Sequence, residues 1–335
     1  MRETFLWPRT AALLGPETIL FSHSLSGTVN LAVVKKQMRK SGLHQFLLLV
    51  TLGLASAGAA QPQTAGTTAL HSLWKVQGKS NVVYLMGSIH VLKAENYPLP
   101  APLEAAFANS QIAAFETDIA AMSDPQLAFK MMSKGRLPEG ETLPQQLSPE
   151  IYAMFTNHLK ETGLPAEMFE HFTPALAAMM IAVLELQKQG FDPEQGLDKH
   201  FFPLARKAGK QTVALETLDF QLALLTDFTK AEGEMLMKTT LKEMETMKTE
   251  FDDMLKAWQT GDADKLEKLL NEASKESPAI YKRLLTDRNR SWLPKIEEFL
   301  RGDKNAIVIV GAAHLVGKEG VVELLNKKGY KVIQE

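Results

Sequence analysis

Two histidines stand in the same local pattern although they lie far apart in the chain. The runs VVYLMGSIHVL and IVIVGAAHLVG each start with apolar, mostly β-branched residues, reach a glycine and place a histidine three residues later, at His90 and His314. Apolar runs of this kind predict buried strands, and a glycine lets the chain turn sharply where a strand ends. The pattern predicts two imidazoles at two strand ends, where they could bind a metal ion or transfer protons.

Acidic residues follow two other apolar runs. The segment FETD places Glu116 and Asp118 after one run. The segment LETL places Glu216 after another, with Asp219 three residues beyond it. Ligands of parallel sheets bind beyond the carboxyl ends of the strands, so we expect one cleft to collect these carboxylates and the two histidines.

This set of side chains suits a divalent cation. Two histidines and one glutamate can hold zinc with a position left for water, and mixed nitrogen and oxygen ligands also suit manganese or cobalt. A bound metal would lower the pKa of its water and polarise a carbonyl group, while a further carboxylate acts as base. Without a metal, the same groups could perform general acid–base catalysis. The simpler alternative is that each histidine is an ordinary loop residue.

An arginine-rich segment adds a cationic group. In LTDRNRSW, Arg288 and Arg290 precede a tryptophan inside an apolar helical stretch. An arginine at this place could clamp a substrate carboxylate or stabilise a transition-state oxyanion. The alternative is a solvated helix face.

The surrounding segments predict the elements that position these residues. A hairpin of strands 73–77 and 82–87 is followed by an amphipathic helix and a buried strand, an order typical of parallel sheets. Further strands are expected at 212–216, 306–310 and, at the sheet edge, 330–334. The middle of the chain, about 123–300, is expected to be largely helical. We therefore predict an α/β fold with a central, mainly parallel sheet and a helical insertion.

A methionine-rich stripe marks a long helix in this middle part. Met237, Met244, Met254 and Trp258 belong to a series of apolar residues that recur every three or four positions. This period predicts an amphipathic helix across the segment. The stripe could form a binding groove, but a face that packs into the core is the interpretation we favour.

The composition bounds the class of protein. The chain has 335 residues, 45% of them hydrophobic, which is enough for a large core. Its 37 basic and 39 acidic residues are interspersed, so no basic stripe favours nucleic acid as a partner. The chain contains no cysteine, which excludes disulfides, zinc–thiolate sites and cysteine nucleophiles and is compatible with an oxidising compartment.

The N-terminal segment has the pattern of a secretory signal. Residues 38–60 start with basic side chains, continue with an apolar run from Phe46 to Ala55 and end in small residues. The run is too short to span a bilayer comfortably, and an uncleaved anchor is the alternative. Residues 1–37 are expected to be a misassigned upstream extension, and residues 61–335 the mature domain. We therefore expect a periplasmic or secreted protein without stable membrane insertion.

Together the motifs resemble those of one family. The chain contains, in order, the segments YLMGSIHVLKAENYPLP, FETD, GLDKHF, AGKQTVALETLDFQ, AWQTGD, DRNRSW and VGAAHLVGKEGVVELLNKKGYKV. In this it is similar to the TraB/GumN family, which includes the Tiki proteins of animals, from about Leu73 to Gln334. The resemblance implies an erythromycin-esterase/ChaN-like fold. It also implies metal dependence, because Tiki members are regarded as manganese- or cobalt-dependent proteases with paired Gly-x-x-His motifs and a glutamate.

The resemblance assigns expected roles to individual residues. The metal ligands that it implies are His90, His314 and Glu116. The catalytic residues that it implies are Glu116, Glu216, Arg288 and Asn289. Among these, Glu216 is expected to be a further ligand or the base that activates water, and Arg288 to stabilise the developing oxyanion.

These expectations combine into one functional hypothesis. We expect an exported hydrolase that acts on a peptide or protein substrate with a divalent transition metal, manganese or cobalt in preference to zinc. The alternative is a non-enzymatic periplasmic protein that binds a peptide, a small ligand, a metal ion or haem.

Overall fold

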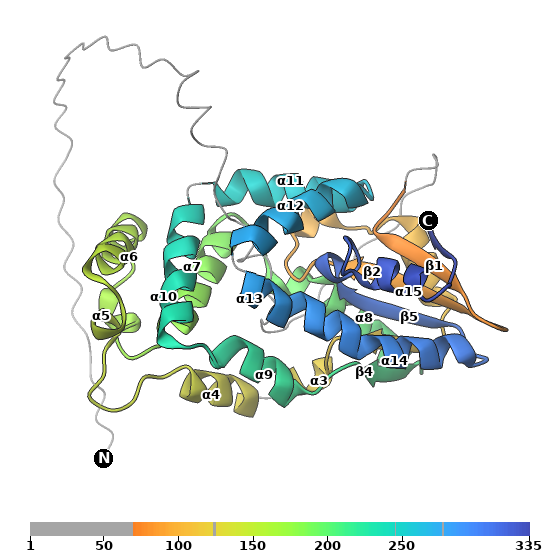
Figure 1. The fold of residues 1–335 in the computed structure, drawn as a ribbon, viewed down its shortest axis with the longest axis horizontal. Coiled ribbons are helices and arrows are strands. Elements are labelled where there is room, and N and C mark those ends of the chain that lie inside the picture. Colours follow the sequence, from red (N-terminus) through yellow and green to blue (C-terminus); the bar gives the residue numbers. More distant parts are fainter. Residues whose placement is uncertain (1–69, 123–124, 245, 277) are drawn as a thin grey trace, which may run out of the picture. The chain divides into compact units, whose positions relative to one another are not determined.

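The computed structural model describes residues 70–122, 125–244, 246–276 and 278–335. Within them, six strands form one sheet in the order β4-β3-β5-β2-β1-β6 (Figure 1). The strands are β1 (Leu73–Gln77), β2 (Val82–Ser88), β3 (Ile112–Phe115), β4 (Gln211–Ala214), β5 (Ala306–Gly311) and β6 (Val332–Gln334).

Four consecutive strands of the sheet run parallel. β4 pairs with β3, β3 with β5 and β5 with β2 in parallel, whereas β1 is antiparallel to both β2 and β6. The register places Ser88 opposite Gly311, and Phe115 opposite both Ile309 and Ala214. All four parallel strands therefore end at the same edge of the sheet. This confirms the mixed α/β fold with a mainly parallel sheet, including the initial hairpin and the final edge strand.

Helices pack on the sheet and form most of the connections between its strands. In the chain between β2 and β4 lie α2 (Ala101–Ala108), α3 (Ile119–Met122), α4 (Pro125–Lys134), α5 (Leu143–Gln146), α6 (Pro149–Thr162), α7 (Pro174–Lys188) and α8 (Leu197–Lys207). After β4 come α9 (Leu218–Thr226), α10 (Lys230–Glu243), α11 (Met247–Gln259), α12 (Ala263–Glu276), α13 (Pro278–Tyr281), α14 (Asp287–Arg301) and α15 (Val321–Lys327). Short 3-10 helices span Ala94–Asn96, Ala166–Met168, Pro193–Gln195 and Ala312–His314, and a π-helical turn, Lys282–Thr286, leads into α14.

The core lies between the sheet and the helices that pack on it. Every residue of β5 is buried, as expected for a central strand covered on both faces. α2 and α8 meet through Phe107 and Phe201, whose ring centres are 4.7 Å apart. α14 and α15 contact one another and lie in front of the sheet in Figure 1. α8 also contacts β3 and β4, and α14 contacts β2.

The prediction of one long helix across Met237 and Trp258 is wrong in one respect. The segment forms two helices, α10 and α11, because the chain turns at Met244 and Thr246. The two halves pack on different partners, α10 on α7 and α6, and α11 on α12. The stripe itself is core, as we favoured, because Met237, Met254 and Trp258 are buried.

The expected upstream extension at 1–37 and the signal sequence at 38–60 lie outside the described residues. Among the helices of the described residues, none is both long enough and apolar enough to cross a bilayer.

Candidate active site

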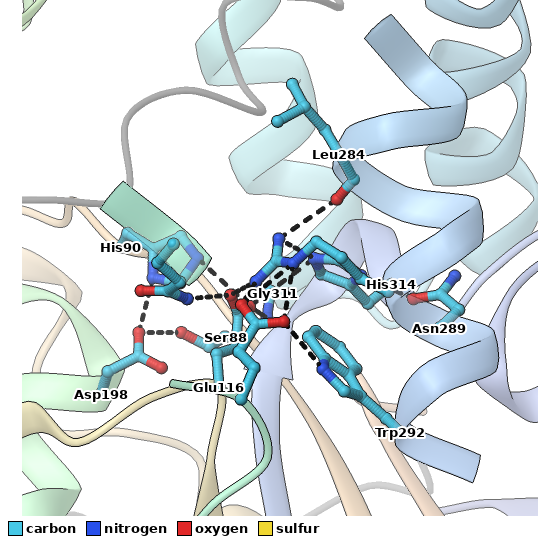
Figure 2. A network of polar contacts seen from close by, with 12 residues as sticks. Ser88, His90, Glu116, Asp198, Leu284, Asn289, Trp292, Gly311 and His314 are labelled. Atoms are coloured by element: carbon cyan, nitrogen blue, oxygen red, sulfur yellow. Dashed lines mark hydrogen bonds and ion pairs between the residues drawn. The ribbon is translucent and has the colours of Figure 1, made fainter. Parts of the chain in front are cut away.

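The residues predicted at the strand ends meet above one edge of the sheet. His90 lies two residues beyond β2, and His314 ends the 3-10 turn after β5. Glu116 directly follows β3, and Glu216 lies two residues beyond β4. The Nε2 atoms of the two histidines are 3.8 and 3.7 Å from the same oxygen, Oε1 of Glu116. Figure 2 shows the two imidazoles on either side of this carboxylate.

A buried arginine joins the two glutamates. Nη2 of Arg288 donates to Oε2 of Glu116 at 2.5 Å and to Oε1 of Glu216 at 2.6 Å. Nε of the same arginine donates to both oxygens of Glu216 at 3.1 Å. Arg288 belongs to the first turn of α14, directly after the π-helical turn, an irregularity that is frequent at functional sites. The arginine that the sequence offered as a possible clamp is thus inside the cluster.

The hydrogen bonds of His314 identify its protonation state. Asn289 uses its amide nitrogen to donate to the Glu319 carbonyl at 2.8 Å, so its Oδ1 is free to accept from His314 Nδ1 at 2.6 Å. On the other side of the ring, Nη1 of Arg288 lies 3.1 Å from His314 Nε2. Because a guanidinium can only donate, Nε2 must present its lone pair. His314 is therefore neutral with its proton on Nδ1, and its Nε2 faces Glu116 and Arg288.

A carboxylate that the sequence analysis missed holds His90. Oδ2 of Asp198, in the first turn of α8, lies 2.7 Å from His90 Nδ1 and accepts from Ser88 Oγ at 2.5 Å (Figure 2). The helix reaches the loop because of Gly196, where a Cβ would lie 2.4 Å from the His90 carbonyl oxygen. In the sequence, Asp198 belongs to the Gly-Leu-Asp segment that begins α8. This segment does not follow an apolar strand, so the strand-end pattern did not select it.

The two histidines have opposite electrostatic environments. Burial disfavours the charged form of His90, but Asp198 and then Glu116 outweigh it and raise its pKa to about 9. For His314, burial and the neighbouring Arg288 cation together lower the pKa to about 3. His90 and His314 occupy the same place in the sequence pattern, but at neutral pH the imidazole of His90 is cationic and that of His314 is neutral.

Glu116 is held as a carboxylate. Burial would raise its pKa, but Arg288, the two histidines and the backbone N–H of Gly311, which donates to Oε1 at 2.8 Å, hold the pKa well below its usual range. Gln221 adds a longer contact from its amide nitrogen to Oε2 at 3.3 Å. Glu116 is thus a fixed negative charge at the centre of the cluster.

Glu216 makes a different set of contacts. Both of its oxygens accept from Arg288, and Oε2 also accepts from the indole N–H of Trp292 at 3.0 Å. Burial raises the pKa of Glu216, and Arg288 opposes this effect. The geometry makes Glu216 the counter-ion of Arg288.

Three other polar residues singled out in the sequence lie outside this cluster. Asp118 is exposed and caps α3 through the Ala120 N–H at 3.0 Å. Asp219 pairs with Lys130, and Arg290 pairs with Glu319 at 2.8 Å on the exposed side of α14. Of the two arginines, only the first takes part in the site.

A small cavity opens beside His90 and Glu116. Its volume is about 30 Å³, enough for a water molecule or a methyl-sized group. The cavity is lined by Thr117, Ile119, Met122, Pro193, Lys199 and Gln221 as well as by the two site residues and Asp198. The hydroxyl of Thr117 is buried there without a hydrogen-bond partner, which is unusual for a buried polar group.

The cluster contains the kinds of atom that transition metals bind in proteins, imidazole nitrogens and a carboxylate oxygen. Each imidazole has its Nδ1 bound to a fixed acceptor and directs Nε2 towards Glu116, the arrangement that outer-shell partners impose on ligating histidines. Space between the groups depends on Gly311, where a Cβ would lie 3.1 Å from His90 Nε2 and 3.4 Å from Glu116 Oε1. Among the described residues, no three His, Asp or Glu side chains lie close enough together to hold a metal ion. Arg288 lies beside the lone pair of His314 instead.

The chain belongs to the TraB/PrgY/gumN family, and its match to the family covers residues 72–334. This range contains the whole described fold except its first two residues and its last one, and all the residues of the cluster.

The curated relatives divide into bacterial and animal proteins. The chain is 25% identical to "Uncharacterized protein YbaP" of Escherichia coli, over 72% of this chain and 87% of that one. It is 24% identical to "Metalloprotease TIKI1" of Homo sapiens, over 86% of this chain and 68% of that one. For "Metalloprotease TIKI2" of Danio rerio the identity is 22%, over 74% of this chain and 57% of the relative. No solved structure matches the chain significantly.

Proposed function

We propose that this chain is a metal-dependent hydrolase of peptide bonds. The observation that carries the proposal is the pair of imidazoles, each fixed through Nδ1 by Asp198 or Asn289, that direct Nε2 to one buried carboxylate oxygen. Two nitrogens and one oxygen leave coordination positions for water and substrate. The names of the Tiki relatives, which call them metalloproteases, support the choice of a peptide bond.

His90, His314 and Glu116 would hold the metal. Manganese or cobalt is favoured, with zinc as a further possibility, and when bound the metal supplies a Lewis acid and a water of lowered pKa. The buried guanidinium of Arg288, which donates to Glu116, would stabilise a developing oxyanion through its positive charge. Glu216 holds Arg288 by two hydrogen-bonded oxygens, which supports a positioning role for it in preference to that of ligand or base. Asn289 fixes the His314 tautomer.

The test is the metal content of the natively purified protein. We expect close to one transition metal per chain in the wild type and its loss in a folded His90→Ala/His314→Ala variant. The matched control is His158→Ala/His171→Ala, which removes two histidines outside the cluster and should retain the metal. Absence of metal from the wild type after incubation with manganese, cobalt and zinc would refute the proposal. With metal bound, cleavage of an unfolded protein such as casein should stop in the presence of a chelator.

A second candidate is a non-enzymatic protein that binds a peptide, small ligand, metal ion or haem in the same place. One observation favours its metal-free form, the binding of a peptide or small ligand: Nη1 of Arg288 lies 3.1 Å from His314 Nε2, on the lone pair that a metal would use. This candidate predicts ligand binding without chelator-sensitive cleavage, and haem capture predicts a visible absorbance band on purification.

Export and the wider fold relationship also belong to the proposal. The signal pattern at 38–60 supports a periplasmic or secreted location. Cell fractionation with an antibody to the mature chain tests it, because a retained, uncleaved product in the cytoplasm would contradict export. The mainly parallel sheet with its helical insertion is compatible with the erythromycin-esterase/ChaN-like relationship, which stays a prediction.

A further inference from the structure

Trp292, the tryptophan of the DRNRSW segment, lies fully buried against the candidate site. It follows Arg288 by four residues on α14, so the two side chains are neighbours on one face of the helix. The centre of its ring system lies 4.9 Å from the guanidinium carbon of Arg288 and 4.4 Å from the ring centre of His314. Figure 2 shows the indole directed towards the cluster. One buried ring therefore contacts two residues of the site.

The indole N–H gives Trp292 a third contact, to Glu216. It donates to Oε2 of that residue at 3.0 Å, and the same oxygen accepts from Nε of Arg288 at 3.1 Å. Oε1 of Glu216 accepts from Nε and Nη2 of Arg288. Donors directed at both oxygens favour the carboxylate form. Burial raises the pKa of Glu216, and a donor such as the indole N–H, which bonds the carboxylate without adding charge, opposes that effect.

The orientation of Arg288 depends on this carboxylate. A guanidinium carries five N–H donors. Nη1 donates to the Leu284 carbonyl and lies 3.1 Å from His314 Nε2. Nη2 donates to both Glu116 and Glu216, and Nε donates to Glu216. All five donors are therefore used. Because Glu216 accepts from two of the three nitrogens, a movement of its carboxylate would turn the whole guanidinium.

We infer that Trp292 is a positioning residue of the candidate site: its indole N–H and its ring hold the carboxylate of Glu216 and the guanidinium of Arg288 in the orientation that directs Nη2 to Glu116. This deepens the proposed function and rests on it for the use that the reaction makes of Arg288. An apolar side chain of similar volume would fill the same space, but it would not donate to Glu216.

A second buried tryptophan supplies the comparison. Trp258 is 2% exposed and donates its indole N–H to the Gly87 carbonyl at 2.7 Å. This acceptor is an uncharged backbone group within β2. Loss of either indole N–H should cost a similar amount of stability, because each removes one buried hydrogen bond. Only the loss at Trp292 should change the orientation of a guanidinium, so Trp258→Phe is the matched control for Trp292→Phe.

The test observes the guanidinium of Arg288 by nitrogen-15 NMR, with the full chain in the presence of a chelator. In the wild type, the hydrogen-bonded Nη groups should rotate slowly about their bonds to the central carbon and give separate proton signals. The signals that are missing from Arg288→Lys identify this residue. Trp292→Phe should speed the rotation about tenfold or more, because it weakens the hold on Glu216. Trp258→Phe should leave the rotation rate unchanged.

A second variant separates the N–H from the packing of the ring. Benzothienylalanine at position 292 keeps the shape of the indole and lacks its N–H, and it should speed the rotation as Trp292→Phe does. A cooperative thermal transition confirms that each variant folds.

Three results would overturn the inference: equal rotation rates in the wild type and the benzothienylalanine variant, an equal change in Trp258→Phe, or fast rotation in the wild type. Because the chelator removes any metal, the inference can succeed while the hydrolase proposal fails on metal content, and the reverse.

Discussion

At the scale of single residues, Arg288 compensates two buried carboxylates at once. Its side chain and those of Glu116 and Glu216 are only 5 or 6% exposed. Removing the guanidinium would leave two negative charges close together and away from water, a much larger penalty than the pair itself is worth. Arg288 is therefore a residue on which both chemistry and stability depend.

Arg288→Met should destabilise the fold by about 3–5 kcal/mol, since it leaves the buried carboxylates without their cation. The melting temperature should fall by about 10 °C. Arg290→Met is the matched control two residues away, because its pair with Glu319 is exposed and should cost less than about 1 kcal/mol. Chemical denaturation of both variants checks the difference, and similar losses for the two would contradict the central role of Arg288.

The pKa values of the two histidines should lie on opposite sides of the pKa of an ordinary imidazole. In chelator-treated protein, His90 should be cationic at neutral pH and lose its proton at about pH 9. His314 should stay neutral, with its proton on Nδ1, until the pH falls to about 3. Nitrogen-15 NMR of the imidazoles measures both.

The change Asp198→Asn separates the causes of the His90 shift. Burial lowers the pKa of His90 and Asp198 raises it, so the variant should lower that pKa while His314 is unaffected. An unchanged His90 pKa, or a protonated Nε2 on His314 in the wild type, would show that the tautomers and partners described above are wrong.

At the scale of elements, the strand ends were predictable and the helices that complete the site were not. Apolar β-branched runs followed by glycine identify strands, and the parallel order that their spacing indicates places His90, Glu116 and His314 at one edge. Asp198 escaped prediction because its helix reaches the loop through a close backbone approach at Gly196, which no periodicity records.

The helical middle illustrates the same limit. The apolar period through Met237 and Trp258 correctly indicates burial, but it does not record whether the chain continues straight or turns between α10 and α11. Which partner each half packs against depends on residues distant in the sequence. Likewise, the pairing of Arg288 with Glu216 depends on where the first turn of α14 lies relative to the loop after β4, although both residues stood out from the sequence as candidates.

The glycine at the end of β5 offers a test at this scale. Gly311 has φ −48° and ψ 133°, a backbone that alanine accepts, but the added Cβ would lie 3.1 Å from His90 Nε2. Gly311→Ala should therefore weaken metal binding about tenfold or more, as disturbances around a metal site do, without unfolding the protein. Calorimetric titration with manganese or cobalt measures the affinity.

Gly233→Ala supplies the control for that substitution. Its Cβ would meet neighbours at an ordinary distance of 3.4 Å, and alanine favours the helix in which it lies. Metal affinity should be unchanged and melting slightly higher. If Gly311→Ala binds metal as tightly as wild type, the space beside His90 and Glu116 is not where the metal lies.

At the scale of the whole molecule, the candidate site exists only in the folded chain. Its residues come from four strand ends and from α8 and α14, between positions 88 and 314, so local unfolding of any of these elements disperses them. A ligand that needs all of them binds the native state alone and must stabilise it by mass action. At a free metal concentration one hundred times its Kd, this amounts to about 2.7 kcal/mol.

We therefore expect manganese or cobalt to raise the melting temperature by about 5–10 °C. The shift should disappear in His90→Ala/His314→Ala and persist in His158→Ala/His171→Ala. A shift of equal size in both variants would place the metal elsewhere, since only the first pair of substitutions touches the strand ends that the fold brings together.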